Sequence, residues 1–129
     1  MTEMPRTFVL ILCLAGLPVM SAATEISIGL VSGHGGVPIN VAQTGERGKA
    51  GFLFIHGNGQ SYLSWQQQLD SYLAKDFHLV AYDLRGHGNS GKPWRKEDYN
   101  HACIWADDID AVLKATGLKK PILVGWSRG

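Results

Sequence analysis

The sequence lacks an excess of charge of either sign. Its 129 residues include 12 Lys and Arg against 11 Asp and Glu, which gives a formal net charge of +1, and the cations form no basic cluster. Nucleic acids and acidic membrane surfaces are bound by concentrated positive charge, so neither is an expected partner. The hydrophobic share of 45% and the charged share of 18% are typical of one ordinary globular domain.

Spacings that are typical of metal sites are also missing. None of the five histidines forms H-x-H, H-E-x-x-H or a cluster with cysteine: His34, His56, His78, His87 and His101. Zinc enzymes need several such ligands at fixed spacing, so a zinc hydrolase is a poor fit. We expect neither a metal nor a cofactor.

The N-terminal apolar run is too short for a stable membrane anchor. It covers Phe8–Met20, 13 residues, whereas a spanning helix needs about 20. One cation, Arg6, precedes it and small residues ending at Ala23 follow it, which is the layout of a cleaved secretory signal peptide. We therefore expect a signal peptide at 1–23, a secreted or periplasmic protein, and a folded region at 24–129. The alternatives are a buried N-terminal helix and an uncleaved anchor.

Cysteine is scarce, with Cys13 inside the expected signal peptide and Cys103 beyond it. Removal of the signal peptide would leave Cys103 without a partner in this stretch, so no internal disulfide is expected. Cys103 would then pair with sequence beyond residue 129 or serve as a small buried apolar residue.

Two kinds of apolar pattern follow the signal peptide. Residues 26–32 and 37–45 are short extended runs on either side of a His-Gly-Gly turn, and they predict a β-hairpin. Nearly continuous apolar runs at 51–57, 78–86 and 121–127 are typical of strands that are covered on both faces in a parallel sheet.

Segments with helical periodicity separate these three runs. Between Tyr62 and Phe77, one face collects Trp65, Leu69, Tyr72 and Leu73. Between Asn100 and Thr116, the same spacing collects Trp105, Ile109, Val112 and Leu113, with Asp107, Asp108 and Asp110 turned away and Gly117 at the expected C-cap. The alternation of strands and helices predicts two βαβ units, and hence an α/β fold with three parallel strands.

The glycine-rich stretch at 86–91, GHGNSG, matches the G-x-G-x-x-G pattern of dinucleotide sites. Pro93 follows almost at once, so no helix opens there to present its N-terminus to a pyrophosphate. The stretch also nearly forms a phosphate loop with Lys92, but Pro93 replaces the Ser or Thr that binds Mg²⁺. A tight turn that leaves a strand is therefore the favoured interpretation.

The run Phe54–Gly59, FIHGNG, ends an expected strand in His-Gly-x-Gly. Glycine tolerates positive φ, so such a strand end can turn sharply and point backbone N–H groups into a pocket. A plain strand-to-helix turn with a buried His56 is the simpler interpretation of these residues alone.

The segment Gly125–Gly129, GWSRG, matches G-x-S-x-G directly after an apolar strand. A serine on a sharp turn of this kind is held in strained backbone geometry, so the residues two before and two after it approach each other and must be small. The Ser127 Oγ would then stand clear of the sheet. The N–H of Arg128 would point to the place where an oxyanion forms. This position is where open α/β sheets bind ligands, which makes the motif far more specific than the pentapeptide alone.

Together, FLFIHGNG, the following helix with Trp65, YDLRGHGNSGKP and LVGWSRG resemble the α/β-hydrolase fold superfamily in order and spacing. The likeness is greatest to its esterase, lipase and cofactor-free haloperoxidase branch, and it runs from about Ile26 to Gly129. It implies the N-terminal half of a mostly parallel α/β-hydrolase sheet that ends at the nucleophile elbow.

The resemblance also implies roles for single residues. Ser127 would be the nucleophile, and the amides of Asn58 and Arg128 would form the oxyanion hole. The GHGNSGKP loop would be structural, so His87 would not be the catalytic base. Position 127 does not offer the carboxylate nucleophile of the haloalkane dehalogenases and epoxide hydrolases in this superfamily, which disfavours both activities.

In the family, the catalytic acid and histidine follow the serine along the chain, whereas all five histidines here precede Ser127. A serine without a base is a weak nucleophile, so we expect both partners beyond residue 129 of a longer enzyme. The expected function is hydrolysis of a carboxylic ester or related acyl bond in a small molecule, with Trp65 and Trp126 lining the acyl pocket or packing in the core. The alternatives are a non-catalytic binding protein of the same fold, an inactive truncated product, and cofactor-free haloperoxidase-like activity.

Overall fold

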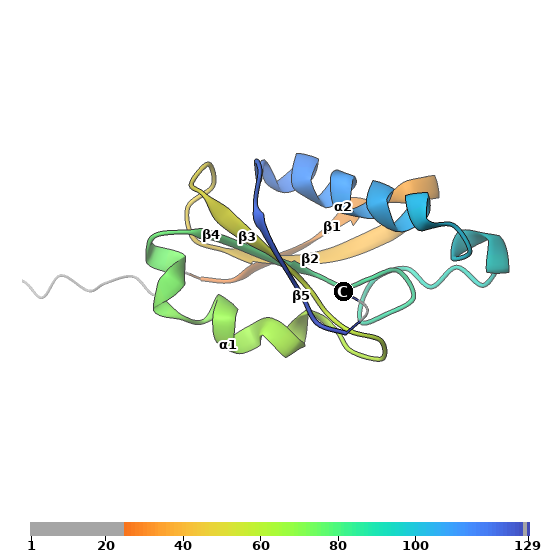
Figure 1. The fold of residues 1–129 in the computed structure, drawn as a ribbon, viewed down its shortest axis with the longest axis horizontal. Coiled ribbons are helices and arrows are strands. Elements are labelled where there is room, and N and C mark those ends of the chain that lie inside the picture. Colours follow the sequence, from red (N-terminus) through yellow and green to blue (C-terminus); the bar gives the residue numbers. More distant parts are fainter. Residues whose placement is uncertain (1–24, 128) are drawn as a thin grey trace, which may run out of the picture.

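The computed structural model describes residues 25–127 and 129 (Figure 1). The expected signal peptide at 1–23 lies outside the described residues and stays a prediction, and so does Arg128. Within the described part of the chain, no helix combines the length and hydrophobicity that crossing a membrane requires.

A five-stranded mixed sheet forms the centre of the fold, with the strand order β1-β2-β4-β3-β5. The first two strands form the predicted antiparallel hairpin, and β2 continues antiparallel to β4. The last three strands are parallel to one another, as predicted. The strands are β1 (Ser27–Ser32), β2 (Pro38–Thr44), β3 (Gly51–Ile55), β4 (His78–Tyr82) and β5 (Ile122–Gly125).

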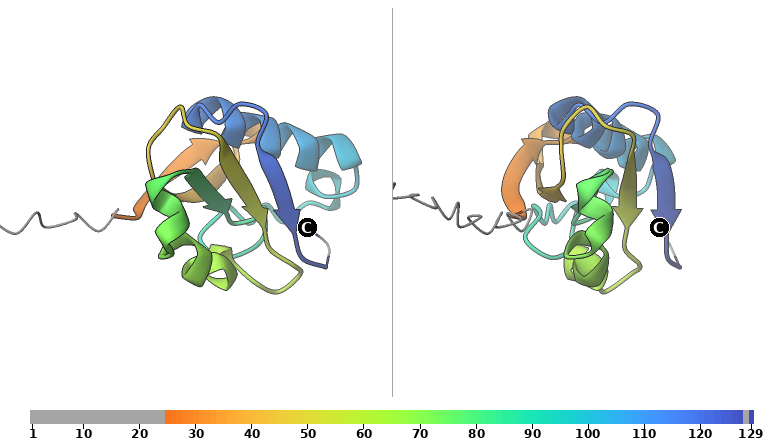
Figure 2. Two further views of the ribbon diagram at one scale, coloured as in Figure 1. Left: turned by 60° about the vertical axis from the view of Figure 1, so that its left-hand side comes forward. Right: turned by 90° about the vertical axis from the view of Figure 1, so that its left-hand side faces the viewer.

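Helical segments cover both faces of the sheet (Figure 2). The two faces bury separate apolar clusters. Helix α2 (Ala102–Thr116) lies on one face and the segment around α1 (Gln66–Leu69) lies on the other (Figure 1). Because successive side chains of a strand point to opposite faces, Leu53 belongs to the α2 side and Phe54 to the α1 side. The sheet is therefore the middle layer of three, as an α/β fold requires.

The prediction of one continuous helix between Tyr62 and Phe77 is wrong. The segment consists of the 3₁₀ turns η2 (Tyr62–Trp65) and η3 (Tyr72–Lys75), with the short α1 between them. Ser71 interrupts the helix, because its hydroxyl donates to the Gln68 carbonyl and accepts from the Leu73 N–H. Tyr72, predicted on the buried face, is consequently 76% exposed.

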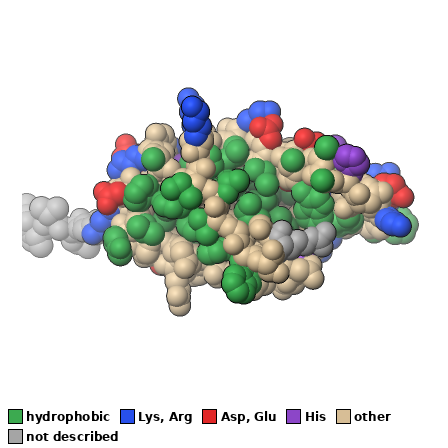
Figure 3. Space-filling view, viewed as in Figure 1, with side chains coloured by type: hydrophobic (Ala, Val, Ile, Leu, Met, Phe, Trp, Pro, Cys, Tyr) green, Lys and Arg blue, Asp and Glu red, His purple; other side chains and the backbone are tan. Residues whose placement is uncertain are grey.

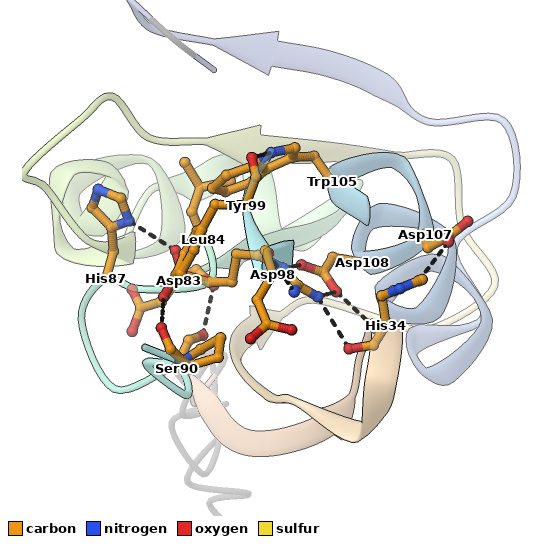
Figure 4. A network of polar contacts seen from close by, with 12 residues as sticks. His34, Asp83, Leu84, His87, Ser90, Asp98, Tyr99, Trp105, Asp107 and Asp108 are labelled. Carbon is orange, nitrogen blue, oxygen red and sulfur yellow. Dashed lines mark hydrogen bonds and ion pairs between the residues drawn. The ribbon is translucent and has the colours of Figure 1, made fainter. Parts of the chain in front are cut away.

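Helix α2 confirms the second helical prediction, and Gly117 ends it in the left-handed conformation at φ +72°. The expected outward position of Asp108 is wrong, because this side chain is only 1% exposed. Asp108 lies one turn before the buried Val112, and its carboxylate accepts two hydrogen bonds from Arg85, Nε at 2.6 Å and Nη2 at 2.7 Å (Figure 4). The burial therefore depends on a partner from the turn after β4.

The same guanidinium holds two distant segments. Arg85 Nη1 donates to the Asp98 carbonyl at the end of η4 (Lys96–Asp98), and Nη2 donates to the His34 carbonyl in η1 (His34–Gly36). The His34 N–H in turn donates to the Asp108 carboxylate. A buried ion pair is tolerated when its remaining polar atoms are bonded, and this network provides those bonds.

Strand β5 differs from its parallel neighbours in exposure. Strand β4 is wholly buried, whereas Ile122 and Leu123 of β5 are 59% and 58% exposed. Hydrophobic side chains accordingly gather on the surface in the view where β5 lies in front (Figure 3). The prediction that all three apolar runs are covered on both faces therefore fails for β5 among the described residues.

Candidate active site

Strand β5 runs into a sharp turn at Ser127. This serine has φ +59°, and Lys120 is the only other non-glycine residue with positive φ in the described chain. The Gly129 N–H donates to the Trp126 carbonyl at 3.0 Å, and the Trp126 N–H donates to the Ile55 carbonyl at 3.1 Å. The turn is thus tied to the end of β3, and the predicted strain at the serine is confirmed.

The two glycines of G-x-S-x-G are required by this geometry. A Cβ on Gly125 would overlap the backbone of Gly129, and a Cβ on Gly129 would overlap the Ile55 carbonyl. The prediction that the residues flanking the serine come close together and must be small is confirmed.

The turn after β3 lies directly against the serine. A Cβ on Gly57 would come within 3.1 Å of both Ser127 Cβ and Trp126 Cδ1. The side chain of Ser127 is exposed at this junction. Two motifs 70 residues apart are therefore brought together at the carboxyl ends of β3 and β5, where a ligand of an open α/β sheet binds.

The β3 turn is closed by its own residues. The Gln60 N–H donates to the Gly57 carbonyl at 3.3 Å, and Gln60 Oε1 accepts from the Gly57 N–H at 2.9 Å. Across the part of the chain that the structure describes, the N–H of Asn58 has no hydrogen-bond partner. Gln60 was missed from the sequence because no motif marks it.

His56 is a buried, neutral histidine. Its Nε2 accepts from the Leu84 N–H at 3.0 Å, so its Nδ1 carries the proton and donates to the Gly57 carbonyl at 2.7 Å. Burial lowers the pKa of His56 below its usual value, which keeps the ring uncharged. The simpler interpretation of His56 as a buried turn histidine is confirmed.

The turn after β4 is held together by Asp83 (Figure 4). Its buried carboxylate accepts from Asn40 Nδ2 at 3.0 Å, from the Asn89 N–H at 2.8 Å and from the Tyr62 N–H at 2.7 Å. Gly88 has φ +48°, and a Cβ there would overlap this carboxylate. The carboxylate fills the centre of the turn, so the predicted tight turn, rather than a phosphate loop, is confirmed.

Two pockets flank the β5 turn. One, of about 260 Å³, lies on the α2 side of the sheet and is lined by Ile55, Tyr82, Leu84, Ala102, Trp105, Ile109 and Gly129. The other, of about 270 Å³, is lined by Gln60, Ser64, Trp65 and Trp126. Trp126 is 64% exposed, whereas Trp65 packs on Phe54 with ring centroids 5.1 Å apart.

Ser127 has no catalytic partner among the described residues, since neither a histidine nor a carboxylate is hydrogen-bonded to it there. Arg128, predicted to supply the second oxyanion amide, lies outside these residues. The described residues also hold no group of three or more His, Cys, Asp or Glu side chains that could bind a metal ion.

A family comparison accounts for this arrangement. The alpha/beta hydrolase fold family matches residues 52–129, from β3 through the serine turn. The chain belongs to the α/β-hydrolase fold family. Epoxide hydrolase 4 of Mus musculus is 36% identical over 94 residues, which are 73% of this chain and 26% of that protein. The bifunctional esterase/perhydrolase DCH of Acinetobacter calcoaceticus is 35% identical over 102 residues, 79% of this chain and 36% of that protein.

Solved structures of α/β hydrolases show the same fold. A Burkholderia cenocepacia protein assigned as an aryl esterase superposes with a TM-score of 0.75 at 40% identity, over 80% of this chain and 38% of that one. The epoxide hydrolase VrEH1 of Vigna radiata gives a TM-score of 0.72 at 30% identity, over 81% and 33%. The chain thus spans between about a quarter and two fifths of the length of these relatives.

Proposed function

We propose that the protein carrying this chain is a serine hydrolase that cleaves a carboxylic ester or related acyl bond in a small molecule. The observation that carries the proposal is the position of Ser127, which is strained at φ +59°, exposed, and next to the turn that bears Asn58. The Asn58 N–H has no hydrogen-bond partner among the described residues. A nucleophile beside a preorganised amide is the minimal arrangement for acyl transfer.

The proposed reaction uses Ser127 Oγ to attack the substrate carbonyl carbon. The carbonyl oxygen becomes an oxyanion, which the N–H groups of Asn58 and Arg128 would bind. A histidine base beyond residue 129, oriented by a carboxylate, would take the hydroxyl proton and return it to the leaving alcohol. Water would then hydrolyse the acyl-enzyme and free the serine.

The identity of residue 127 selects among the activities of the relatives. Their names include both esterases and epoxide hydrolases, and the resemblance to the superfamily implies a carboxylate nucleophile for epoxide hydrolases. Ser127 offers a hydroxyl, which favours the esterases. Likeness to an esterase/perhydrolase also supports cofactor-free peroxidation as a second candidate, which an assay with hydrogen peroxide would separate from simple hydrolysis.

The pocket at Trp65 and Trp126 is the proposed acyl site, because both ring systems border the cavity beside the serine turn.

We also propose export through a signal peptide at 1–23. The exported protein would then begin at Thr24, which N-terminal sequencing would show.

The test of the proposal uses Ser127→Ala in the full-length protein. Hydrolysis of p-nitrophenyl esters should fall at least about 10³-fold, and labelling by a fluorophosphonate probe should disappear. The matched control is Ser27→Ala, an exposed serine on β1, which should retain both. Labelling that survives Ser127→Ala would exclude Ser127 as the nucleophile. A wild type that neither hydrolyses nor labels would favour a binding protein or an inactive product.

A further inference from the structure

The turns after β3 and β4 each place a histidine against the other turn. His56 from the β3 end accepts from the Leu84 N–H, and His87 from the β4 turn lies with Nε2 3.3 Å from Asn58 Oδ1. The two imidazole rings are neighbours, with centroids 5.3 Å apart and planes tilted by 59°. The two histidines therefore form a reciprocal clasp between the β3 turn and the β4 turn.

His87 is held within the β4 turn by hydrogen bonds, and Figure 4 draws the one made by its ring. Its N–H donates to the Leu84 carbonyl at 2.9 Å, and its own carbonyl accepts from the Ser90 N–H at 3.0 Å. Its Nδ1 donates to the Arg85 carbonyl at 3.1 Å, which fixes the ring. Asn58 is exposed by contrast, and among the described residues its side chain has no hydrogen-bond partner besides His87.

We infer that His87 is a positioning residue of the oxyanion hole, holding the side chain of Asn58 so that the Asn58 N–H stays directed at the developing oxyanion. The inference rests on the proposed function. It gives the GHGNSG turn a catalytic consequence without making His87 a base.

The contact between His87 and Asn58 can form whether the His87 ring is neutral or cationic. Because Nδ1 donates to a carbonyl, a neutral His87 presents a lone pair at Nε2, which accepts from the NH₂ group of the Asn58 amide when that amide is turned. A cationic His87 donates from Nε2 to Asn58 Oδ1 instead. In both states the side chain of Asn58 has a fixed partner, so its backbone is restrained.

Restraint matters because oxyanion donors act by preorganisation. A donor that must reorient during the reaction loses much of its effect on the transition state while binding of the substrate is little changed. Loss of the His87 contact should therefore lower kcat far more than it raises KM.

The experiment compares His87→Phe and His87→Gln in the full-length protein. Phe keeps a ring against His56 but removes both nitrogens, so kcat for a p-nitrophenyl ester should fall about tenfold with KM changed less than twofold. Gln keeps a polar group that can reach Asn58 and should restore most of kcat. In an Asn58→Ala background, where the side chain to be held is absent, His87→Phe should have no further effect on kcat.

The control is His34→Phe, which removes a half-exposed imidazole bound to Asp107 on another part of the fold and should leave kcat unchanged. An unchanged kcat in His87→Phe, or losses that add in the double variant, would overturn the positioning role. An equal loss in His87→Gln accompanied by a matching fall in Tm would also overturn it, since that result indicates a merely structural role. A wild type without ester hydrolysis or probe labelling would overturn the proposed function itself, and this inference with it.

Discussion

The turns after β4 and β5 are similar in composition but differ in whether their serine side chains are hydrogen-bonded. Both follow a parallel strand, and both combine glycines with serine and another polar residue. In the β4 turn, Ser90 donates to the Asp83 carbonyl at 2.6 Å and accepts from the Asn40 N–H at 2.9 Å. In the β5 turn, Ser127 is exposed and bonds to none of the described residues.

The two turns also differ in which residue adopts the left-handed backbone. Gly86 and Gly88 have positive φ in the β4 turn, where the absence of a Cβ makes this conformation inexpensive. In the β5 turn the positive φ falls on Ser127 itself, at a cost of about 1–3 kcal/mol. A glycine-rich turn whose polar groups are hydrogen-bonded within the fold stabilises the protein. A turn that leaves a polar side chain exposed on a strained backbone is a candidate catalytic site.

Asp83→Ala in the β4 turn should have the largest effect that tests this comparison, and the effect is a loss of stability. The change leaves the N–H groups of Tyr62 and Asn89 and the amide of Asn40 without their buried acceptor. The Tyr62 N–H and the Asn40 amide are buried, and at about 1–3 kcal/mol for each unsatisfied buried group the free energy of unfolding should fall by at least about 2 kcal/mol, as measured by urea denaturation. Asp70→Ala, which removes an exposed carboxylate bonded to Gln66, is the control. Similar stability of the two variants would mean that Asp83 does not hold the turn.

Compared with Asp83→Ala, the variant Gly125→Ala in the β5 turn should show a smaller loss of stability and a larger loss of activity. The added methyl would push Gly129 away and so move Ser127, and a displacement near 1 Å costs about 100-fold in kcat/KM. The free energy of unfolding should fall by about 1–3 kcal/mol, the usual cost of overpacking. Gly29→Ala on β1, where the new Cβ meets nothing within 4 Å, should leave activity intact. Full activity in Gly125→Ala would show that the serine turn tolerates displacement.

The smallest expected effect is the pH dependence of stability that buried histidines of the β3 and β4 region cause. Burial lowers the pKa of His56, and it also lowers the pKa of His78 in β4. Below about pH 6.5 the unfolded chain takes up protons on these side chains while the folded protein does not, so the unfolded state gains stability. The free energy of unfolding should therefore be constant above about pH 6.5 and decline as the pH falls below it.

Urea denaturation at a series of pH values between 5 and 8 measures this decline. His56→Gln should reduce the slope below pH 6.5, although the variant starts from a lower stability because it loses the bond to Leu84. An unchanged slope in that variant would show that His56 does not contribute to the acid sensitivity.

Local pattern was sufficient to predict the hairpin, the three parallel strands, α2 with its glycine cap, and the close approach of Gly125 and Gly129. Each of these depends on periodicity or on backbone sterics within a few residues. The same reasoning failed for the segment 62–77, because the hydroxyl of Ser71 competes with the helical hydrogen bonds. This competition also acts between near neighbours. The sequence, however, does not show whether a serine hydroxyl in a helical pattern will bond to the neighbouring backbone groups or leave the helical hydrogen bonds intact.

The amino-acid sequence by itself determined the order of strands and helices, the turn that strains Ser127 and the family to which the chain belongs. Only the tertiary structure decided which distant partners the polar side chains contact: Asp108 binds Arg85, 23 residues away, and Asn58 contacts His87, 29 residues away. The physical reason is the range of the forces involved. Periodicity and backbone sterics act between neighbours along the chain, whereas burial of a charge or capture of an amide requires a partner that only the folded sheet brings within hydrogen-bonding distance.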